Sequence, residues 1–117
     1  MRFRLSAPAR CDIATILERS REQFGAEARL RYERLIATGL NAIAKDDMPP
    51  SAKPAPGLKG DVFIFHLRHV YQGDSSQSVR KPRHFIVFRR VQPDLVAIIR
   101  VLHDSMDLPA RLRDEAG

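Results

Sequence analysis

His103, Asp104 and Ser105 follow one another near the C-terminal end of the chain, and together they carry the side-chain types of a catalytic triad. In a triad the serine attacks, the histidine accepts its proton and the aspartate orients the histidine. Such residues converge from separate parts of a fold, whereas neighbours in one turn are expected to point apart. The run therefore predicts a structural turn and not a nucleophilic site.

The four histidines could instead serve as zinc ligands. His66 and His69 are three residues apart, which places them on opposite faces of a strand. Cys11 is the only cysteine in the sequence, so no cysteine pair supports a zinc site. We expect neither a metal nor another cofactor, and we expect Cys11 to be a small core residue early in a helix.

Arginine supplies sixteen of the 20 basic side chains, and the formal net charge is +6. Guanidinium groups suit carboxylate and phosphate partners, so the charge favours acidic partners. Arg68, Arg89, Arg90 and Arg100 are predicted to lie on neighbouring strands, where Arg68 and Arg100 interrupt apolar stretches. They either pair with carboxylates of the same chain or face an acidic partner, and we favour the second interpretation.

Two helices are expected in the first half of the chain. Ser6 is a start signal for a helix over residues 8–24, and Gly25 is a stop signal. The apolar positions of this helix are Ile13, Ile16, Leu17 and Phe24. A second apolar stripe runs from Ala28 to Ile43 at helical spacing, and Gly39 within it indicates close packing against another element. The pair forms a helical hairpin.

The remaining pattern is that of an antiparallel sheet. A first short strand is expected at Phe3–Leu5, and further strands at Val62–Val70, Arg83–Val91 and Leu95–Leu102, the last being the most apolar and therefore central. Residues 48–57 and 72–80 are expected to be loops, and Asp107 is expected to cap a short helix over 108–112. The order β-α-α-β-β-β-α predicts one α+β domain of two layers over residues 1–117, with the other sheet face partly open.

Nothing in the sequence predicts a membrane protein. No apolar run approaches the roughly 20 residues of a membrane span, and the N-terminus has no signal-peptide pattern. A lone cysteine fits a reducing compartment. We therefore expect a cytoplasmic protein without a membrane partner.

The element order and three segments carry a family resemblance. The segments are LSAPARCDI at 5–13, RHFIVFRR at 83–90 and, most specifically, RVLHDSMDL at 100–108. With them the chain resembles the ParE branch of the RelE/ParE toxin superfamily over roughly residues 3–112. The loops at 48–57 and 72–80 depart from a minimal member of that family.

The resemblance implies the toxin of a type II toxin–antitoxin pair, which would bind DNA gyrase and trap it on cleaved DNA without a catalytic residue of its own. It implies a cognate ParD-like antitoxin, whose C-terminal segment wraps the toxin in a hetero-oligomer. Direct nucleic-acid binding is not expected as the main activity. An antitoxin helix would find a groove between the first helix and the margin of the 28–43 stripe. The candidate target or antitoxin contacts are Arg68, Arg89, Arg100, His103, Met106 and Asp107.

The alternative is a RelE-like, ribosome-dependent mRNA endonuclease of the same fold. That chemistry needs cations at the scissile phosphate and a group that activates the ribose 2′-hydroxyl. We expect these groups where Ile64, His66, Phe85, Ser105 and Met106 stand. Most of those side chains cannot serve, and His66, Arg68 and Arg100 do not complete the set. The sequence therefore favours the gyrase-directed toxin and leaves the endonuclease as the alternative.

Overall fold

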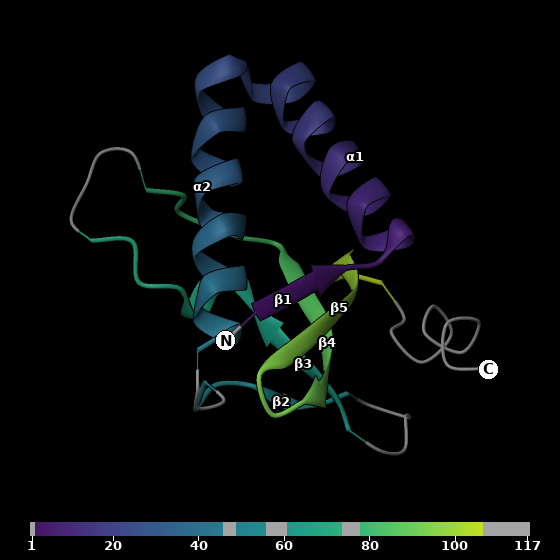
Figure 1. Cartoon of the computed structure of the whole chain (residues 1–117). Coiled ribbons are helices and arrows are strands. Elements are labelled where there is room, and N and C mark those ends of the chain that lie inside the picture. The colour runs from purple at the N-terminus through teal and green to yellow at the C-terminus, as the bar shows by residue number, and fades with distance from the viewer. Residues whose placement is uncertain (1, 46–48, 56–60, 74–77, 107–117) are drawn as a thin grey trace.

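A helical hairpin packs on one face of a five-stranded sheet in the computed structural model, which describes residues 2–45, 49–55, 61–73 and 78–106 (Figure 1). The helices are α1 (Ala7–Phe24) and α2 (Ala26–Ile43). The strands are β1 (Arg2–Leu5), β2 (Lys53–Pro54), β3 (Val62–His66), β4 (His84–Gln92) and β5 (Leu95–His103). This α+β, two-layer arrangement confirms the predicted fold class. Neither described helix has the length and apolar character to cross a membrane.

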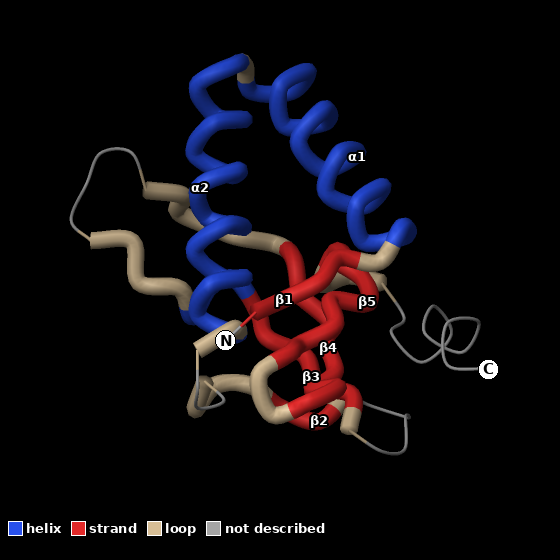
Figure 2. Tube along the Cα trace, in the orientation of Figure 1, coloured by secondary structure: helices blue, strands red, loops and turns tan. Residues whose placement is uncertain are grey.

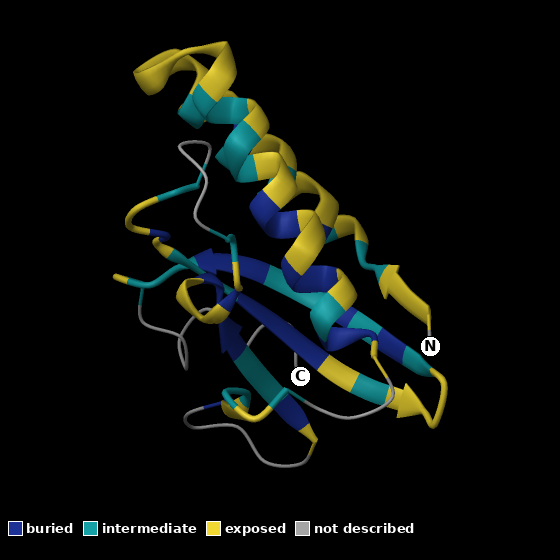
Figure 3. Ribbon diagram, turned by 90° about the vertical axis from the view of Figure 1, so that its left-hand side faces the viewer, coloured by how far each residue is buried: buried dark blue, intermediate teal, exposed yellow. Residues whose placement is uncertain are grey.

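Helix α1 begins and ends where its local signals predict. The side-chain oxygen of Ser6 accepts a hydrogen bond from the Ala9 N–H at 3.0 Å, and Gly25 follows the helix with φ +94°, a left-handed conformation that favours glycine. The prediction that Cys11 is a core residue is wrong, because Cys11 is exposed. Phe24, one of the apolar positions of α1, is 74% exposed. The far end of the hairpin projects beyond the sheet, which leaves its side chains without a sheet surface to cover (Figure 3).

Helix α2 packs on the sheet, and Gly39 makes a close contact there. The buried residues of α2 are Leu35, Ile36, Gly39, Leu40 and Ile43, which confirms the predicted stripe. A Cβ atom added to Gly39 would lie 2.9 Å from Leu67 Cδ2 and 3.2 Å from Ile86 Cδ1. The close packing predicted for this glycine is therefore confirmed.

The sheet has the order β1-β5-β4-β3-β2, in which β1 runs parallel to β5 and the other pairs are antiparallel (Figure 2). The predicted meander of β3, β4 and β5 is confirmed, as is the participation of the first strand. The prediction that β5 is central is confirmed in that β5 has a neighbouring strand on each side. The middle strand of the five is β4. The loop predicted at 48–57 contains an unexpected edge strand, β2, which consists of two residues.

The predicted strand Val62–Val70 is wrong beyond His66. A 3-10 turn, η1 (Leu67–His69), follows β3, and the His66 ring caps it by accepting the Arg68 N–H at Nδ1 over 3.0 Å. A side chain that bonds its own backbone two residues later competes with the strand ladder, and alternation of residue types does not reveal this. Arg68 therefore lies on an exposed turn and not on a strand. The predicted cap at Asp107 and the helix over 108–112 lie outside the described residues.

Two apolar clusters lie on opposite faces of the sheet. The larger cluster faces the helices and includes Ile86, Phe88 and Val101. The second contains Ala55, Val62, Val87 and Leu102, which alternate with residues of the first cluster along β3, β4 and β5. Val87 is 0% exposed and Leu102 2%, so the centre of this second face is covered, while Ile64 and Phe85 beside it are only partly buried.

Candidate functional site

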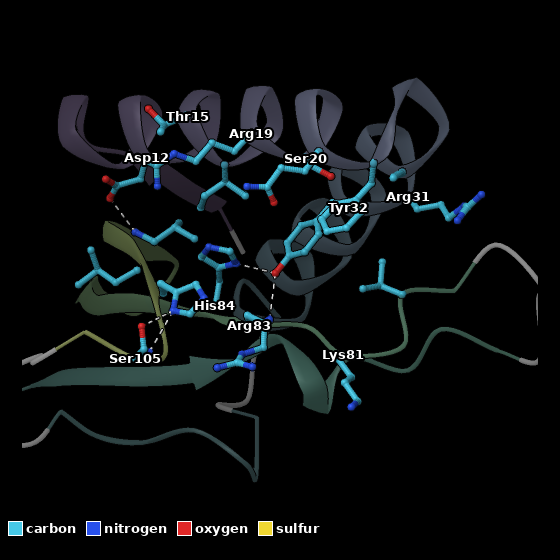
Figure 4. A pocket seen from close by; sticks show the side chains of 18 of the residues that line it. Asp12, Thr15, Arg19, Ser20, Arg31, Tyr32, Lys81, Arg83, His84 and Ser105 are labelled. Carbon is cyan, nitrogen blue, oxygen red and sulfur yellow. Dashed lines mark hydrogen bonds between the residues drawn. The ribbon is translucent and has the colours of Figure 1, made fainter.

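An open groove of about 1300 Å³ lies beside α1 (Figure 4). We call it the basic groove; its lining residues fall within segments 11–24, 28–32, 78–84 and 100–106. Its cationic lining residues are Arg19, Arg31, Arg80, Lys81, Arg83 and Arg100. Among the described lining residues, Asp12 is the one carboxylate. The groove therefore presents a surface that attracts anions.

Asp12 joins α1 to β5 at one end of the basic groove. Its Oδ2 accepts a hydrogen bond from Arg100 Nε at 2.7 Å, and its Oδ1 accepts from Arg100 Nη2 at 2.8 Å. Oδ2 also accepts the Val101 N–H at 2.9 Å. Strand β1 pairs with β5 only as far as Leu5 opposite Ile98, so Asp12 provides the acceptor where the strand partner has ended. Arg100 is thus paired with a carboxylate of the same chain, which is the interpretation that we did not favour, and its role as a contact residue stays a prediction.

Asp104 lies in the turn after β5 and links it to the end of β3 and to the start of β4. Its Oδ2 lies 3.0 Å from His66 Nε2, and its Oδ1 accepts from Arg83 Nε at 3.1 Å. Because His66 Nδ1 accepts the Arg68 N–H, the ring proton is on Nε2 and is donated to Asp104. Burial alone would raise the pKa of Asp104, but the hydrogen bonds from His66 and Arg83 outweigh it and lower that pKa. The turn is therefore fixed by an ionised carboxylate.

Tyr32 on α2 and His84 on β4 form a second polar pair at the groove. The Tyr32 hydroxyl oxygen accepts the Arg83 N–H at 3.1 Å, and the same hydroxyl shares a hydrogen bond with His84 Nδ1, 2.6 Å away (Figure 4). Burial, with the nearby His103, lowers the pKa of His84 to about 4. Burial raises the pKa of Tyr32. Both side chains are therefore uncharged near neutral pH.

We expect the free energy of unfolding to fall as the pH drops from about 6.5 to about 4. In this pH window His84 binds a proton in the unfolded chain but not in the folded chain, because its folded pKa is about 4 and its usual pKa is 6.5. Above pH 6.5 this contribution is constant. The total change from this group is about 2 kcal/mol, with allowance for its partial exposure.

Urea unfolding at several pH values checks this expectation. His84→Gln keeps an acceptor for Tyr32 and cannot titrate, so its stability should be less dependent on pH in the same window. Equal pH dependence of the two proteins between pH 4 and 6.5 would contradict the assignment.

The His103-Asp104-Ser105 run is a turn, although its side chains do not all point apart as predicted. His103 Nδ1 lies 2.7 Å from Ser105 Oγ and accepts the Ser105 N–H at 3.1 Å. Asp104 Oδ1 is 3.7 Å from that same nitrogen. A triad histidine uses one ring nitrogen for the nucleophile and the other for the carboxylate. The geometry here therefore closes a local turn and does not relay a proton.

The predicted contact residues divide between two regions. Arg100, His103 and Met106 line the basic groove. Arg68 on η1 and Arg89 on β4 are exposed and are not among its lining residues, and Asp107 lies outside the described residues. The groove predicted between the first helix and the margin of the 28–43 stripe agrees with the α1 and α2 lining residues, but the sequence did not indicate a role for Tyr32 or His84. The charge run Arg80-Lys81-Pro82-Arg83 was the sequence signal available for the groove wall that precedes β4.

The helical hairpin on a mixed, mostly antiparallel sheet defines the chain as a protein with the fold of RelE/ParE-like toxins. The model of the family described as ParE toxin of type II toxin–antitoxin system, parDE, matches residues 3–108. The chain therefore belongs to the ParE toxin family, and it is the toxin of a type II system, which implies a cognate antitoxin. A comparison with curated proteins gave no match.

Proposed function

We propose that this toxin binds DNA gyrase and traps it on cleaved DNA, without catalytic chemistry of its own, and that a ParD-like antitoxin neutralises it. The family supplies the toxin–antitoxin pair. One observation favours gyrase binding over mRNA cleavage. The positions where an endonuclease would need charged groups hold side chains that cannot supply them.

Those positions are apolar or already engaged. Ile64 and Phe85 are partly buried against the second apolar cluster. His66 is 3% exposed, and its two ring nitrogens are hydrogen-bonded to Arg68 and Asp104. A general base must reach the proton that it abstracts, and a buried ring with both nitrogens engaged has no free atom for that proton. His66 is therefore not positioned to activate a ribose 2′-hydroxyl.

The candidate contacts supply two surfaces for protein partners. His103 and Met106 lie at the basic groove, where cationic side chains suit an acidic partner segment. Arg89 is exposed on β4, away from that groove. We assign the surface around Arg89 to gyrase and the basic groove to the antitoxin, which would cover the groove until the toxin is released.

The test incubates purified toxin with gyrase, supercoiled DNA and ATP, and in parallel with translating ribosomes. We expect linear DNA with covalently attached protein in the first reaction, and its suppression when the cognate antitoxin is added. Codon-positioned mRNA cuts without any effect on gyrase would show that the endonuclease alternative is correct.

A variant refines the same test. Arg89→Ala is expected to reduce trapping by about fivefold or more, because an arginine at the centre of an interface typically contributes more than about 1 kcal/mol. Arg4→Ala is the matched control, since Arg4 is another exposed arginine on a strand. Equal trapping by the two variants would remove Arg89 from the gyrase surface.

A further inference from the structure

The basic groove holds positive charge that the described residues do not neutralise. Its one described carboxylate, Asp12, is used by Arg100 and the Val101 N–H. The side chains of Arg19, Arg80 and Lys81 form no ion pair with another described residue, and all three line the groove. An anionic ligand in the groove would meet these three charges without breaking an existing pair.

Arg31 adds an incompletely bonded guanidinium to the same lining. Its Nε is buried without a hydrogen-bond partner among the described residues. Its Nη2 donates to Glu27 Oε2 at 3.4 Å, a long bond to a side chain that is 88% exposed. Buried donors are normally satisfied, so a small shift of this side chain toward an acceptor in the groove would be favourable.

The α1 wall of the groove includes a row of hydrogen-bond donors beside apolar residues such as Ile16. Thr15, Arg19 and Gln23 recur every four residues, so they lie on one line of the helix, about 6 Å apart along its axis. A ligand with a repeated acceptor, such as a chain of phosphates, fits this row of donors.

Cations lie on the opposite wall as well. Lys81 and Arg83 come from the segment before β4, across the groove from Thr15 and Arg19 on α1 (Figure 4). Phe24 also lines the groove and is 74% exposed, so its ring is available for stacking. A charged groove with an exposed aromatic ring is the arrangement by which proteins bind single nucleic-acid strands without regard to sequence.

We infer that the basic groove binds a single nucleic-acid strand through its phosphates, with Arg19, Arg80 and Lys81 as phosphate contacts. Arginine pairs with phosphate in bidentate geometry, and the Thr15 and Gln23 donors suit the remaining phosphate oxygens. This deepens the proposed function and rests on it in one respect: the strand bound in the cell is the DNA that gyrase has opened.

The direct test measures binding of the full chain to a fluorescein-labelled single-stranded DNA of about 12 nucleotides. Fluorescence anisotropy is recorded over a range of salt concentrations. The groove variant Arg19→Gln/Arg80→Gln/Lys81→Gln is compared with Arg4→Gln/Arg34→Gln/Lys45→Gln. The control removes the same charge from three exposed residues that are not among the groove's lining residues. Long-range attraction therefore changes equally in both variants.

We expect the groove variant to bind DNA at least about tenfold more weakly than the control variant. Its slope of log K against log salt should be smaller by about 2, since each single-strand phosphate contact contributes about 0.7. Equal affinities of the two variants, or no binding by the unaltered protein, would overturn the inference. Thermal unfolding of both variants verifies that they are folded.

Two further arms separate the possible failures. An acidic amphipathic peptide that binds in a groove-dependent manner, while DNA does not, would assign the groove to a protein segment instead. In the gyrase assay, undiminished trapping by the groove variant would overturn the assignment of gyrase-opened DNA and leave the proposed function standing. Groove-dependent DNA binding without any trapping by the unaltered toxin would refute the proposed function and leave the groove's ligand in place.

Discussion

Replacing Asp12 by alanine is expected to lower the free energy of unfolding by about 3 kcal/mol. The change removes both acceptors of the Arg100 guanidinium, whose side chain is 21% exposed, and the acceptor of the Val101 N–H. An uncompensated, largely buried charge and an unpaired backbone donor each carry a desolvation penalty. The change would also remove the hydrogen bonds that join α1 to β5 at the groove.

Urea unfolding near neutral pH measures this effect. The matched control is Glu33→Ala, which removes an exposed carboxylate from its ion pair with Arg29 on α2 and should cost less than about 1 kcal/mol. Asp12→Asn keeps one acceptor but removes the charge, so its stability should lie between those of the alanine variant and the unaltered protein. A loss for Asp12→Ala no larger than that for Glu33→Ala would contradict the role of Asp12.

Replacing Gly39 by valine is expected to destabilise the protein by about 2–3 kcal/mol, through overpacking between α2 and the sheet. The new Cβ would lie 2.9 Å from Leu67 Cδ2 and 3.2 Å from Ile86 Cδ1, and Ile86 is fully buried. The two branching methyl groups would then require either α2 or the η1 turn to move. Gly39→Ala should cost much less, because the gain in helix propensity of about 1 kcal/mol offsets the contact with a flexible leucine methyl.

The comparison uses the thermal midpoint and the urea midpoint of each variant. Ala37→Val is the control, because Ala37 is exposed on the same helix and reports only the lower helix propensity of valine. If Gly39→Val and Ala37→Val had equal stabilities, the α2–sheet contact would be less tight than the structure indicates.

Elements set by near neighbours in the chain were predictable. The start of α1 depends on Ser6 and its bond to the Ala9 N–H, and the end depends on Gly25, all within one helical turn of the boundary. The stripe on α2 follows from periodicity alone. One local contact was nevertheless not predicted: the His66 ring ends β3 by capping η1 two residues later, and the alternation along the strand does not indicate this.

The groove depends on contacts between residues far apart in the sequence. Asp12 meets Arg100 across 88 positions, and Tyr32 meets His84 across 52. No periodicity or spacing rule relates such residues, because their approach results from how α1 and α2 pack on the sheet.

The sequence by itself determined the α+β class, the helical hairpin, the meander and, through RVLHDSMDL, the family, since these follow from local propensity and from a specific segment. Only the tertiary structure decided which arginines are neutralised inside the chain and which remain for a partner. The physical reason is that charge availability depends on distance in space: Arg100 meets a carboxylate of the first helix, while Arg19 and Lys81 meet none among the described residues.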